Sequence, residues 1–486
     1  MARVVTSDRR PGLDPLRFSQ PLGGALVFLG LAAAMPVMHG SKGCASFAKA
    51  LLTRHFNEPV PLQTTGVTEV SAVLGSGDDL IANLDGIRAR QNPRIIGLLT
   101  TGVTEVSGED VAGQVRQYIA MMNHTTPEGA PLIVRVSTPD FAGGLSDGWS
   151  AALRSLVATV PFDHADFDEY PGTRGAGSAP ETVAVLVGPS LSAADLDELC
   201  ALIRSFGMAP VLVPDLSGSL DGHLAPSWQP TTTGGTGLAQ LRRLDEAGLI
   251  ITAGATAAEA GVDLAARTAA DLVQHDHLSG LAAMDRLVTE LMAYSGRGPA
   301  PEVRRARARL ADGLLDTHFV LGGARIALAM EPEALVAVGS LLRDVGAEIV
   351  AAVSPTAAPV LATAPWDEIV IGDLTELEER ALEGGAELLI GSSHVRTVAD
   401  RIGAAHLSVG FPIYDRLGSA LRTTGGYGGS LRLLVDAANR LLDHQHHHSD
   451  HRSDLHLDHR ARPEDAAQPP LAPFDQLDVL CQESPC

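Results

Sequence analysis

Residues 182–206 read TVAVLVGPSLSAADLDELCALIRSF, a short apolar run followed by an amphipathic stretch. The run 182–187 is typical of a buried strand. Ser192, with Asp195 three residues later, forms a variant of the capping box and predicts the start of a helix. The apolar residues of that helix recur at helical spacing and form one stripe: Leu196, Leu199, Cys200, Ile203 and Phe206. The stretch therefore predicts one strand–helix unit.

The same alternation continues on both sides of this unit. Further strands are expected at 94–99, 131–136, 211–213, 249–251, 325–329, 348–353, 368–371, 387–391 and 406–410, and further helices over 109–122, 147–159, 333–345 and 429–443. Strands that alternate with helices of about 10–15 residues predict βαβ units and parallel sheets. We therefore expect an α/β protein with three Rossmann-like, doubly wound parallel-sheet domains.

The expected domain boundaries follow from where the pattern restarts and where the composition changes. A polar, proline-containing arm (1–17) is expected to be loose, and it precedes the three α/β domains at 18–180, 181–321 and 322–443. The remaining segment, 444–486, is rich in histidine, aspartate and proline and is predicted to be a disordered acidic tail.

Composition excludes several function classes. The 486 residues carry 36 basic and 58 acidic side chains, a net charge of −22, and only 4% aromatic residues. No basic run is present, so neither nucleic acid nor an anionic membrane is an expected partner. Four cysteines are too few for a disulfide scaffold and suit a reducing compartment.

The most apolar run, 22–38, is expected to be a buried segment. It contains three glycines and a proline, it is short for a membrane span, and it lacks the flanks of a signal peptide. We therefore expect a cytoplasmic protein without a membrane segment. Familiar motifs such as the P-loop and His-Glu-x-x-His are absent from the sequence.

One string occurs twice. Thr-Thr-Gly-Val-Thr-Glu-Val-Ser stands at 64–71 and again at 100–107. A single exact copy is too little for a repeat protein. It predicts two similar loops within the first domain.

Cys44 stands at the end of the glycine-containing string His-Gly-Ser-Lys-Gly-Cys at 39–44. Backbone N–H groups and a nearby lysine would favour a thiolate there, and a thiolate in such a loop suits an iron–sulfur cluster. The other interpretation is an ordinary free thiol. Cys200 lies on an apolar helix stripe and is expected in the core, whereas Cys481 and Cys486 lie in the tail. A four-thiolate cluster at Cys44 would need ligands from another polypeptide, and therefore a subunit interface.

Several longer strings resemble the nitrogenase component 1 family, and within it the NifN-type subunits. They include SQPLG at 19–23, HGSKGC at 39–44, RHFNEP at 54–59, PLQTT at 61–65, STPDF at 137–141, PDLSGSLDGH at 214–223, LDTHF at 315–319 and VGFPIYDRLG at 409–418. The resemblance extends from about residue 17 to residue 443.

The resemblance implies a scaffold subunit for biosynthesis of the iron–molybdenum cofactor, without turnover of its own. It implies three Rossmann-like domains, an α2β2 heterotetramer with NifE, and a [4Fe–4S] cluster at the subunit interface with Cys44 as one ligand. The complex would receive an iron–sulfur precursor from NifB, work with the nitrogenase Fe protein, and pass the finished cofactor to apo-nitrogenase. The precursor would be held mainly by NifE, so no precursor ligand is assigned in this chain.

The alternative within the family is the catalytic β-subunit of nitrogenase, or a related reductase that uses its cluster as a relay. That β-subunit contributes three cysteines to its P-cluster, and their positions correspond to Ser19, Cys44 and Gly102 here. Only Cys44 is a cysteine. The resemblance therefore favours the scaffold.

The tail carries a second candidate metal site. Clustered imidazoles bind divalent transition metals, and the tail contains His444, His446, His447, His448 and His451. One interpretation is local metal capture, and the other is a solvated extension without a fixed site.

Overall fold

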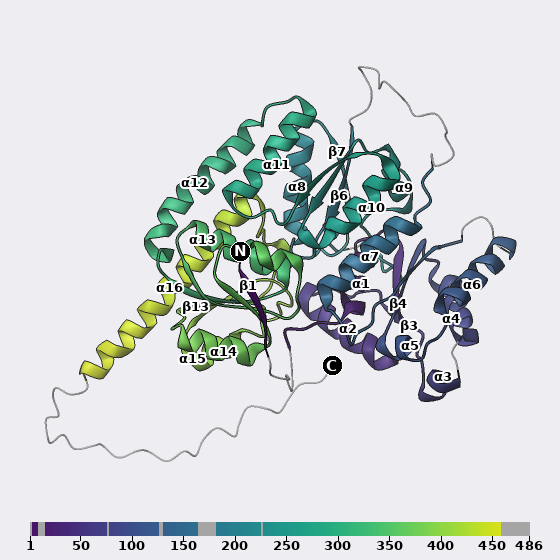
Figure 1. Ribbon diagram of the computed structural model, residues 1–486, viewed down its shortest axis with the longest axis horizontal. Coiled ribbons are helices and arrows are strands. Elements are labelled where there is room, and N and C mark those ends of the chain that lie inside the picture. The colour runs from purple at the N-terminus through teal and green to yellow at the C-terminus, as the bar shows by residue number, and fades with distance from the viewer. Residues whose placement is uncertain are drawn as a thin grey trace, which may run out of the picture. The chain divides into compact units, whose positions relative to one another are not determined.

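The computed structural model describes residues 2–7, 15–74, 77–125, 130–163, 181–224 and 227–457. The chain forms one compact unit over Met1–Leu442 and a second unit over Asp443–Cys486. Within the first unit, the strands form three sheets with helices packed around them (Figure 1). Every strand pair in these sheets is parallel, which confirms the α/β class.

The first sheet has the order β3-β2-β4-β5. Its strands are β2 (Ala34–His39), β3 (Gln63–Thr64), β4 (Ile95–Thr100) and β5 (Leu132–Val136). The accompanying helices are α1 (Gln20–Leu29), α2 (Lys42–Phe56), α3 (Glu69–Leu74), α4 (Gly77–Gln91), α5 (Gly102–Val106), α6 (Val111–Thr125) and α7 (Leu145–Thr159). The apolar run 22–38 forms α1 and β2, and every residue of these two elements is buried. The expected buried segment is confirmed.

The second sheet has the order β7-β6-β8-β9. Its strands are β6 (Thr182–Val187), β7 (Ala209–Val213), β8 (Leu249–Ala253) and β9 (Asp271–His275), and its helices include α8 (Ala193–Ser205), α9 (Leu238–Arg242), α10 (Ala258–Thr268), α11 (Gly280–Ser295) and α12 (Pro301–Leu321), with short 3-10 turns η1 (Leu244–Glu246) and η2 (Ala255–Ala257). The capping box before α8 is confirmed. The Asp195 N–H donates to Ser192 Oγ at 3.1 Å, and the Ser192 N–H donates to Asp195 Oδ2 at 2.9 Å.

The third sheet has six strands in the order β1-β12-β11-β10-β13-β14. They are β1 (Arg3–Thr6), β10 (Arg325–Ala329), β11 (Glu348–Ser354), β12 (Glu368–Ile371), β13 (Leu388–Gly391) and β14 (Ala405–Ser408), with helices α13 (Pro332–Asp344), α14 (Leu374–Glu383) and α15 (Arg396–Ile402) and turns η3 (Pro359–Thr363) and η4 (Ser419–Leu421). The domain boundaries near 180 and 322 stay a prediction.

Two terminal expectations need correction. The N-terminal arm was expected to be loose, but Arg3–Thr6 forms β1 and pairs with β12, residue Arg3 opposite Glu368. β1 supplies backbone hydrogen-bond partners to β12, which would otherwise be the edge strand of the sheet. No pattern within residues 3–6 predicts this pairing. At the other end, α16 (Gly426–Leu457) continues past residue 444, where the composition had predicted disorder. Extending an existing helix needs no new nucleus, so a polar segment can prolong it. Residues 458–486 lie outside the described residues.

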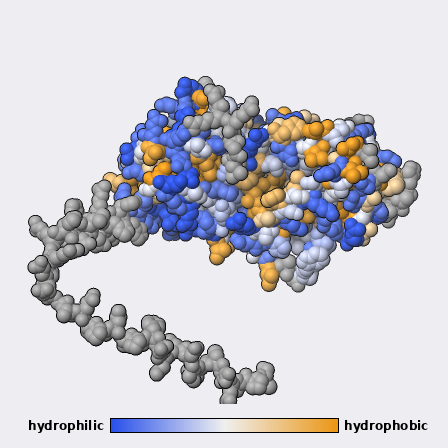
Figure 2. Space-filling view, turned by 90° about the horizontal axis from the view of Figure 1, so that it is seen from below, coloured by the Kyte–Doolittle hydropathy of each residue, from blue (hydrophilic) through white to orange (hydrophobic). Residues whose placement is uncertain are grey.

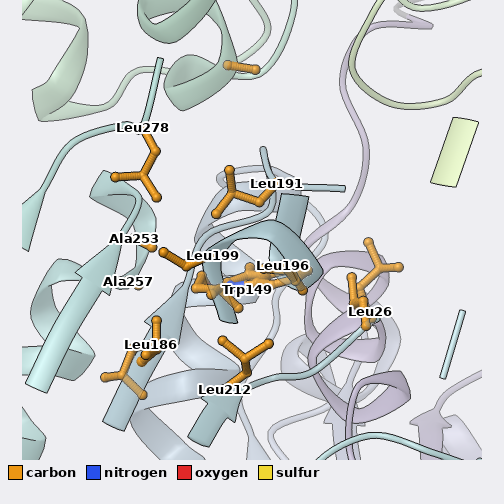
Figure 3. Close-up of a cluster of buried hydrophobic side chains, with 14 of the residues drawn as sticks. Leu26, Trp149, Leu186, Leu191, Leu196, Leu199, Leu212, Ala253, Ala257 and Leu278 are labelled. Carbon is orange, nitrogen blue, oxygen red and sulfur yellow. Dashed lines mark hydrogen bonds between the residues drawn. The ribbon is translucent and has the colours of Figure 1, made fainter. Parts of the chain in front are cut away.

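Trp149 joins the first sheet to the second. It lies on α7, it is 1% exposed, and its indole N–H donates to Val187 O at the end of β6, at 2.9 Å. Figure 3 shows it among leucines of α8 and of the second sheet, including Leu196, Leu199 and Leu212. Ring burial and a satisfied N–H occur together, so Trp149 anchors α7 against the second sheet.

Candidate functional site: the Cys44 loop

Cys44 lies at the carboxyl edge of the first sheet. Strand β2 ends at His39, two residues form a short loop, and α2 begins at Lys42, which places Cys44 in the first turn of the helix. Its side chain is partly exposed, and its sulfur lies 3.4 Å from Ser41 Oγ. The positive end of the helix dipole favours an anion in this turn. The thiol is therefore accessible in a setting that suits a metal-bound thiolate.

The two copies of the repeated string hold this loop from opposite sides. The first copy follows β3 and the second spans the end of β4, and these strands are the two neighbours of β2. From the first copy, Thr64 Oγ1 and the Val67 N–H donate to Gly40 O at 3.0 and 2.9 Å. From the second, Thr101 Oγ1 donates to His39 O at 2.9 Å. The two copies differ in conformation, because Gly66 has φ of +68° whereas the equivalent Gly102 begins α5, so the predicted similarity of the two loops is wrong. Both segments nevertheless fix the backbone that carries Cys44.

The loop also depends on Gly40. A Cβ atom at this position would overlap the side chain of Thr101. Thr104 of the second copy adds a further bond, because its Oγ1 donates to His39 O at 3.0 Å. A larger residue at 40 would separate the loop from the strand end that supports it.

His39 is a part of the site that the sequence did not single out. Its side chain is fully buried, with Nδ1 2.9 Å from Thr65 Oγ1 and Nε2 3.2 Å from Glu109 Oε2. Burial lowers the pKa of His39, because desolvation disfavours the charged ring. The neutral His39 ring thus contacts Thr65 with one nitrogen and Glu109 with the other, and these contacts hold the end of β2 in place. The continuous apolar run that precedes it, 34–38, was the sequence signal that it ends a buried strand.

The two other positions at which the resemblance places cysteines of the catalytic β-subunit belong to elements other than α2. Ser19 precedes α1 as its N-cap residue, and Gly102 is the first residue of α5. A Cβ atom at Gly102 would overlap Oδ1 of Asp140. The carboxylate of Asp140 thus fills the space into which a side chain at 102 would point.

The other candidate ligands belong to other segments of the chain. Cys200 is on α8, it is 6% exposed, and burial raises its pKa to about 11, so its expected place in the core is confirmed. His444 and His446 lie on α16, and the side chains of His447, His448 and His451 are outside the description, as are Cys481 and Cys486. Across the described ranges, no group of three or more His, Cys, Asp or Glu side chains could hold a metal ion. The tail site stays a prediction.

The segments around Cys44 carry exposed apolar side chains. Phe47 lies one turn further along α2 and is 82% exposed. Exposed apolar residues also occur in or beside both copies of the repeated string and after β5: Val70, Val73, Val103, Val106 and Phe141. The view from below in Figure 2 shows apolar side chains over the centre and right, the side on which Figure 1 places the first sheet. Exposed apolar side chains are typical of an interaction surface where they form a contiguous patch.

The chain is similar to known proteins of one family. The family model for nitrogenase component 1 type oxidoreductase matches residues 19–442. The chain is 39% identical over 446 residues to the nitrogenase iron-molybdenum cofactor biosynthesis protein NifN of Bradyrhizobium diazoefficiens, which covers 92% of both chains. It is 36% identical over 488 residues to the protein of the same name from Rhodobacter capsulatus, with 100% of both chains covered.

A solved structure described as nitrogenase Cp1 at pH 6.5 has the same fold. Its TM-score is 0.81 at 24% sequence identity, and the match covers 96% of this chain and 98% of that one. None of the helices in the described ranges combines the length and hydrophobicity that a bilayer crossing needs.

Proposed function

Because the chain belongs to the nitrogenase component 1 type oxidoreductase family, we propose that it is a scaffold subunit for biosynthesis of the iron–molybdenum cofactor. Relatives named for that biosynthesis match it over nearly their full length, which supports this role. The expected partner is a NifE-type subunit, in an α2β2 heterotetramer. The expected exchange partners are NifB as precursor donor, the nitrogenase Fe protein, and apo-nitrogenase as acceptor of the finished cofactor. The cytoplasmic location stays a prediction.

The observation that carries the proposal is the single accessible cysteine at the strand edge. Cys44 is partly exposed in the first turn of α2, and the only other cysteine in the described ranges, Cys200, is buried. A [4Fe–4S] cluster takes four ligands, and one thiolate at an exposed edge fits a cluster that receives its other ligands from a partner subunit. When bound, such a cluster supplies one-electron transfer at the interface.

The same observation argues against the catalytic β-subunit. That role needs cysteines at the positions of Ser19 and Gly102, and in this chain Asp140 occupies the space beside Gly102. A glycine offers no ligand side chain, and the carboxylate of Asp140 lies where a Cβ atom at this position would point. We therefore propose a scaffold without catalytic turnover.

The apolar side chains around Cys44 support a partner at this edge. Phe47, Val106 and Phe141 are 82%, 76% and 63% exposed in the isolated chain. Burying such residues against a second subunit removes apolar surface from water and excludes water from a cluster held there. The chain's own residues would then position one thiolate, fix its backbone through the repeated loops, and shield it.

The test is an anaerobic preparation of the complex with the NifE-type partner. Iron content and the EPR spectrum are measured for the wild type, for Cys44→Ala and for Cys200→Ala as the matched control. We expect Cys44→Ala to lose or alter the cluster signal while the complex survives on gel filtration, and Cys200→Ala to retain the signal. An unchanged signal in Cys44→Ala would show that the cluster ligand lies elsewhere.

A second measurement separates the scaffold from a reductase. The complex is supplied with Fe protein, ATP and a reducible nitrogenase substrate. A scaffold releases no product beyond background but activates apo-nitrogenase once precursor, molybdate and homocitrate are added. Sustained substrate reduction without apo-nitrogenase would contradict the scaffold role.

A further inference from the structure

In the second sheet, a side chain of the protein itself lies at the place where sheets of this kind bind their ligands. In an open parallel sheet, ligands bind beyond the carboxyl ends of the strands where the strand order reverses. Here that point lies between β6 and β8, in the order β7-β6-β8-β9. The loop after β6 begins at Gly188, and the loop after β8 begins at Gly254 and leads through η2 into α10. These two loops form the walls of the position.

The occupant is the carboxylate of Glu333, which arrives from the first turn of α13 beside the third sheet. Glu333 is 1% exposed. Its Oε1 accepts a hydrogen bond from Ser190 Oγ, and its Oε2 accepts one from the Thr256 N–H at 2.9 Å. One donor therefore comes from each wall. A buried carboxylate requires such partners, because its desolvation is otherwise costly.

Two glycines shape the walls around this carboxylate. A Cβ atom at Gly188 would overlap both oxygens of Glu333, and one at Gly254 would lie 2.5 Å from Oε1. Gly254 also has φ of +127°, a conformation that side chains rarely adopt. The close approach of backbone on both sides leaves a slot with the dimensions of one carboxylate.

All three sheets meet at this place. Trp149 from the first sheet's α7 donates to Val187 O, next to Gly188. Glu331, two residues before Glu333, accepts from Ser146 Oγ of α7 at 2.8 Å. The start of α13 thus places the carboxylate of Glu331 against α7 and that of Glu333 against the second sheet.

We propose that the switch point of the second sheet is a carboxylate-binding site, occupied in cis by Glu333, and that it binds a small free carboxylate when that side chain is removed. Glu333 links the third sheet to the second, and its carboxylate excludes other anions from this position. The chemistry that recognises the ligand is a hydroxyl and a backbone N–H facing two oxygens across a glycine-walled slot. The proposal is independent of the cluster at Cys44.

The first test is chemical rescue of full-length Glu333→Ala. The variant is expected to melt at least about 5 °C below the wild type, because buried donors lose their acceptor. Acetate matches the lost carboxylate and its neighbouring carbon. It should raise the melting temperature of the variant along a saturable curve, whereas chloride at equal ionic strength should not.

Controls separate a built site from a general salt effect. The exposed Glu383→Ala variant and the wild type should show no saturable response to acetate. Butyrate, which is too long for the slot, should rescue Glu333→Ala less than acetate. Rescue by inorganic phosphate equal to that by acetate would overturn the carboxylate assignment, as would equal responses of Glu333→Ala and Glu383→Ala.

A double-mutant cycle keeps the proposal testable if Glu333→Ala folds poorly. Gly188→Ala should lower the melting temperature of the wild type, because its methyl group overlaps the carboxylate. In the Glu333→Ala background the same methyl group enters vacant space, so its effect should vanish or change sign. Additive effects of the two substitutions would show that the two residues do not share the site.

Discussion

Alkylation rates of the two described cysteines provide a direct check on the Cys44 site. Burial raises the pKa of Cys200 to about 11, from an ordinary value of 9.0. A difference of about two units lowers the thiolate fraction at pH 8 about a hundredfold, and the thiolate is the reactive form. The residue Cys200 is also only 6% exposed, so we expect the reagent to reach its thiol only when α8 opens.

The assay is pulsed labelling of the full-length chain with iodoacetamide at pH 8, followed by digestion and mass spectrometry. The rate for each cysteine in urea serves as its own reference. We expect the native rate of Cys200 to lie below about one hundredth of its unfolded rate. Cys44, which is partly exposed, should stay within about tenfold of its unfolded rate.

Two results would refute this reasoning. Labelling of Cys200 within tenfold of its unfolded rate would mean that α8 does not pack as the structure has it. Protection of Cys44 as strong as that of Cys200, in the chain without its partner, would mean that its thiol is not available to a cluster. If the reasoning holds, adding the NifE-type partner should lower the labelling rate of Cys44 and leave that of Cys200 unchanged.

Three further outcomes are expected. Asp195 accepts hydrogen bonds from three backbone N–H groups. Asp195→Ala should therefore lower the free energy of unfolding by about 3 kcal/mol or more and speed amide exchange at residues 424–425. Asp197 is exposed, so Asp197→Ala, the control, should change that free energy by no more than about 0.5 kcal/mol. Trp149→Phe removes the N–H group that donates to the Val187 carbonyl. It should lower the free energy of unfolding, measured by calorimetry, by about 1–3 kcal/mol. A variant as stable as the wild type would contradict this hydrogen bond. Burial lowers the pKa of His55 to about 4, so the unfolded chain takes up its proton first and stability should fall as pH drops from about 6.5 to 4. His55→Gln should flatten that part of the pH profile of urea unfolding, and an unchanged profile would rule His55 out as its source.

Much of the local structure could be predicted from the sequence because its signals are local. The strand 182–187 is β6 with the same bounds, and Ser192 caps α8 as its spacing with Asp195 indicated. Both signals depend on residues within a few positions of one another. The place of Cys44 after a buried strand was visible for the same reason.

The surroundings of Cys44 could be predicted only in part. The repeated string predicted two similar loops, but the two copies adopt different conformations. It did not show that β3 and β4 would flank β2 and bring both segments to the loop that carries Cys44. The contact of Asp140 with the space beside Gly102 and the burial of His39 against Glu109 join segments from different strand ends. No periodicity within one segment contains this information.

By itself, the sequence determined the α/β class, most strand and helix positions, the single cysteine at a strand edge, and the family. Only the tertiary structure decided that Arg3–Thr6 pairs with Glu368–Ile371, that α16 continues through residue 457, and that Glu333 enters the second sheet. The physical reason is range. Periodicity and capping act between neighbouring residues, whereas strand order, edge pairing and the burial of a carboxylate depend on which distant segments supply the hydrogen-bond partners.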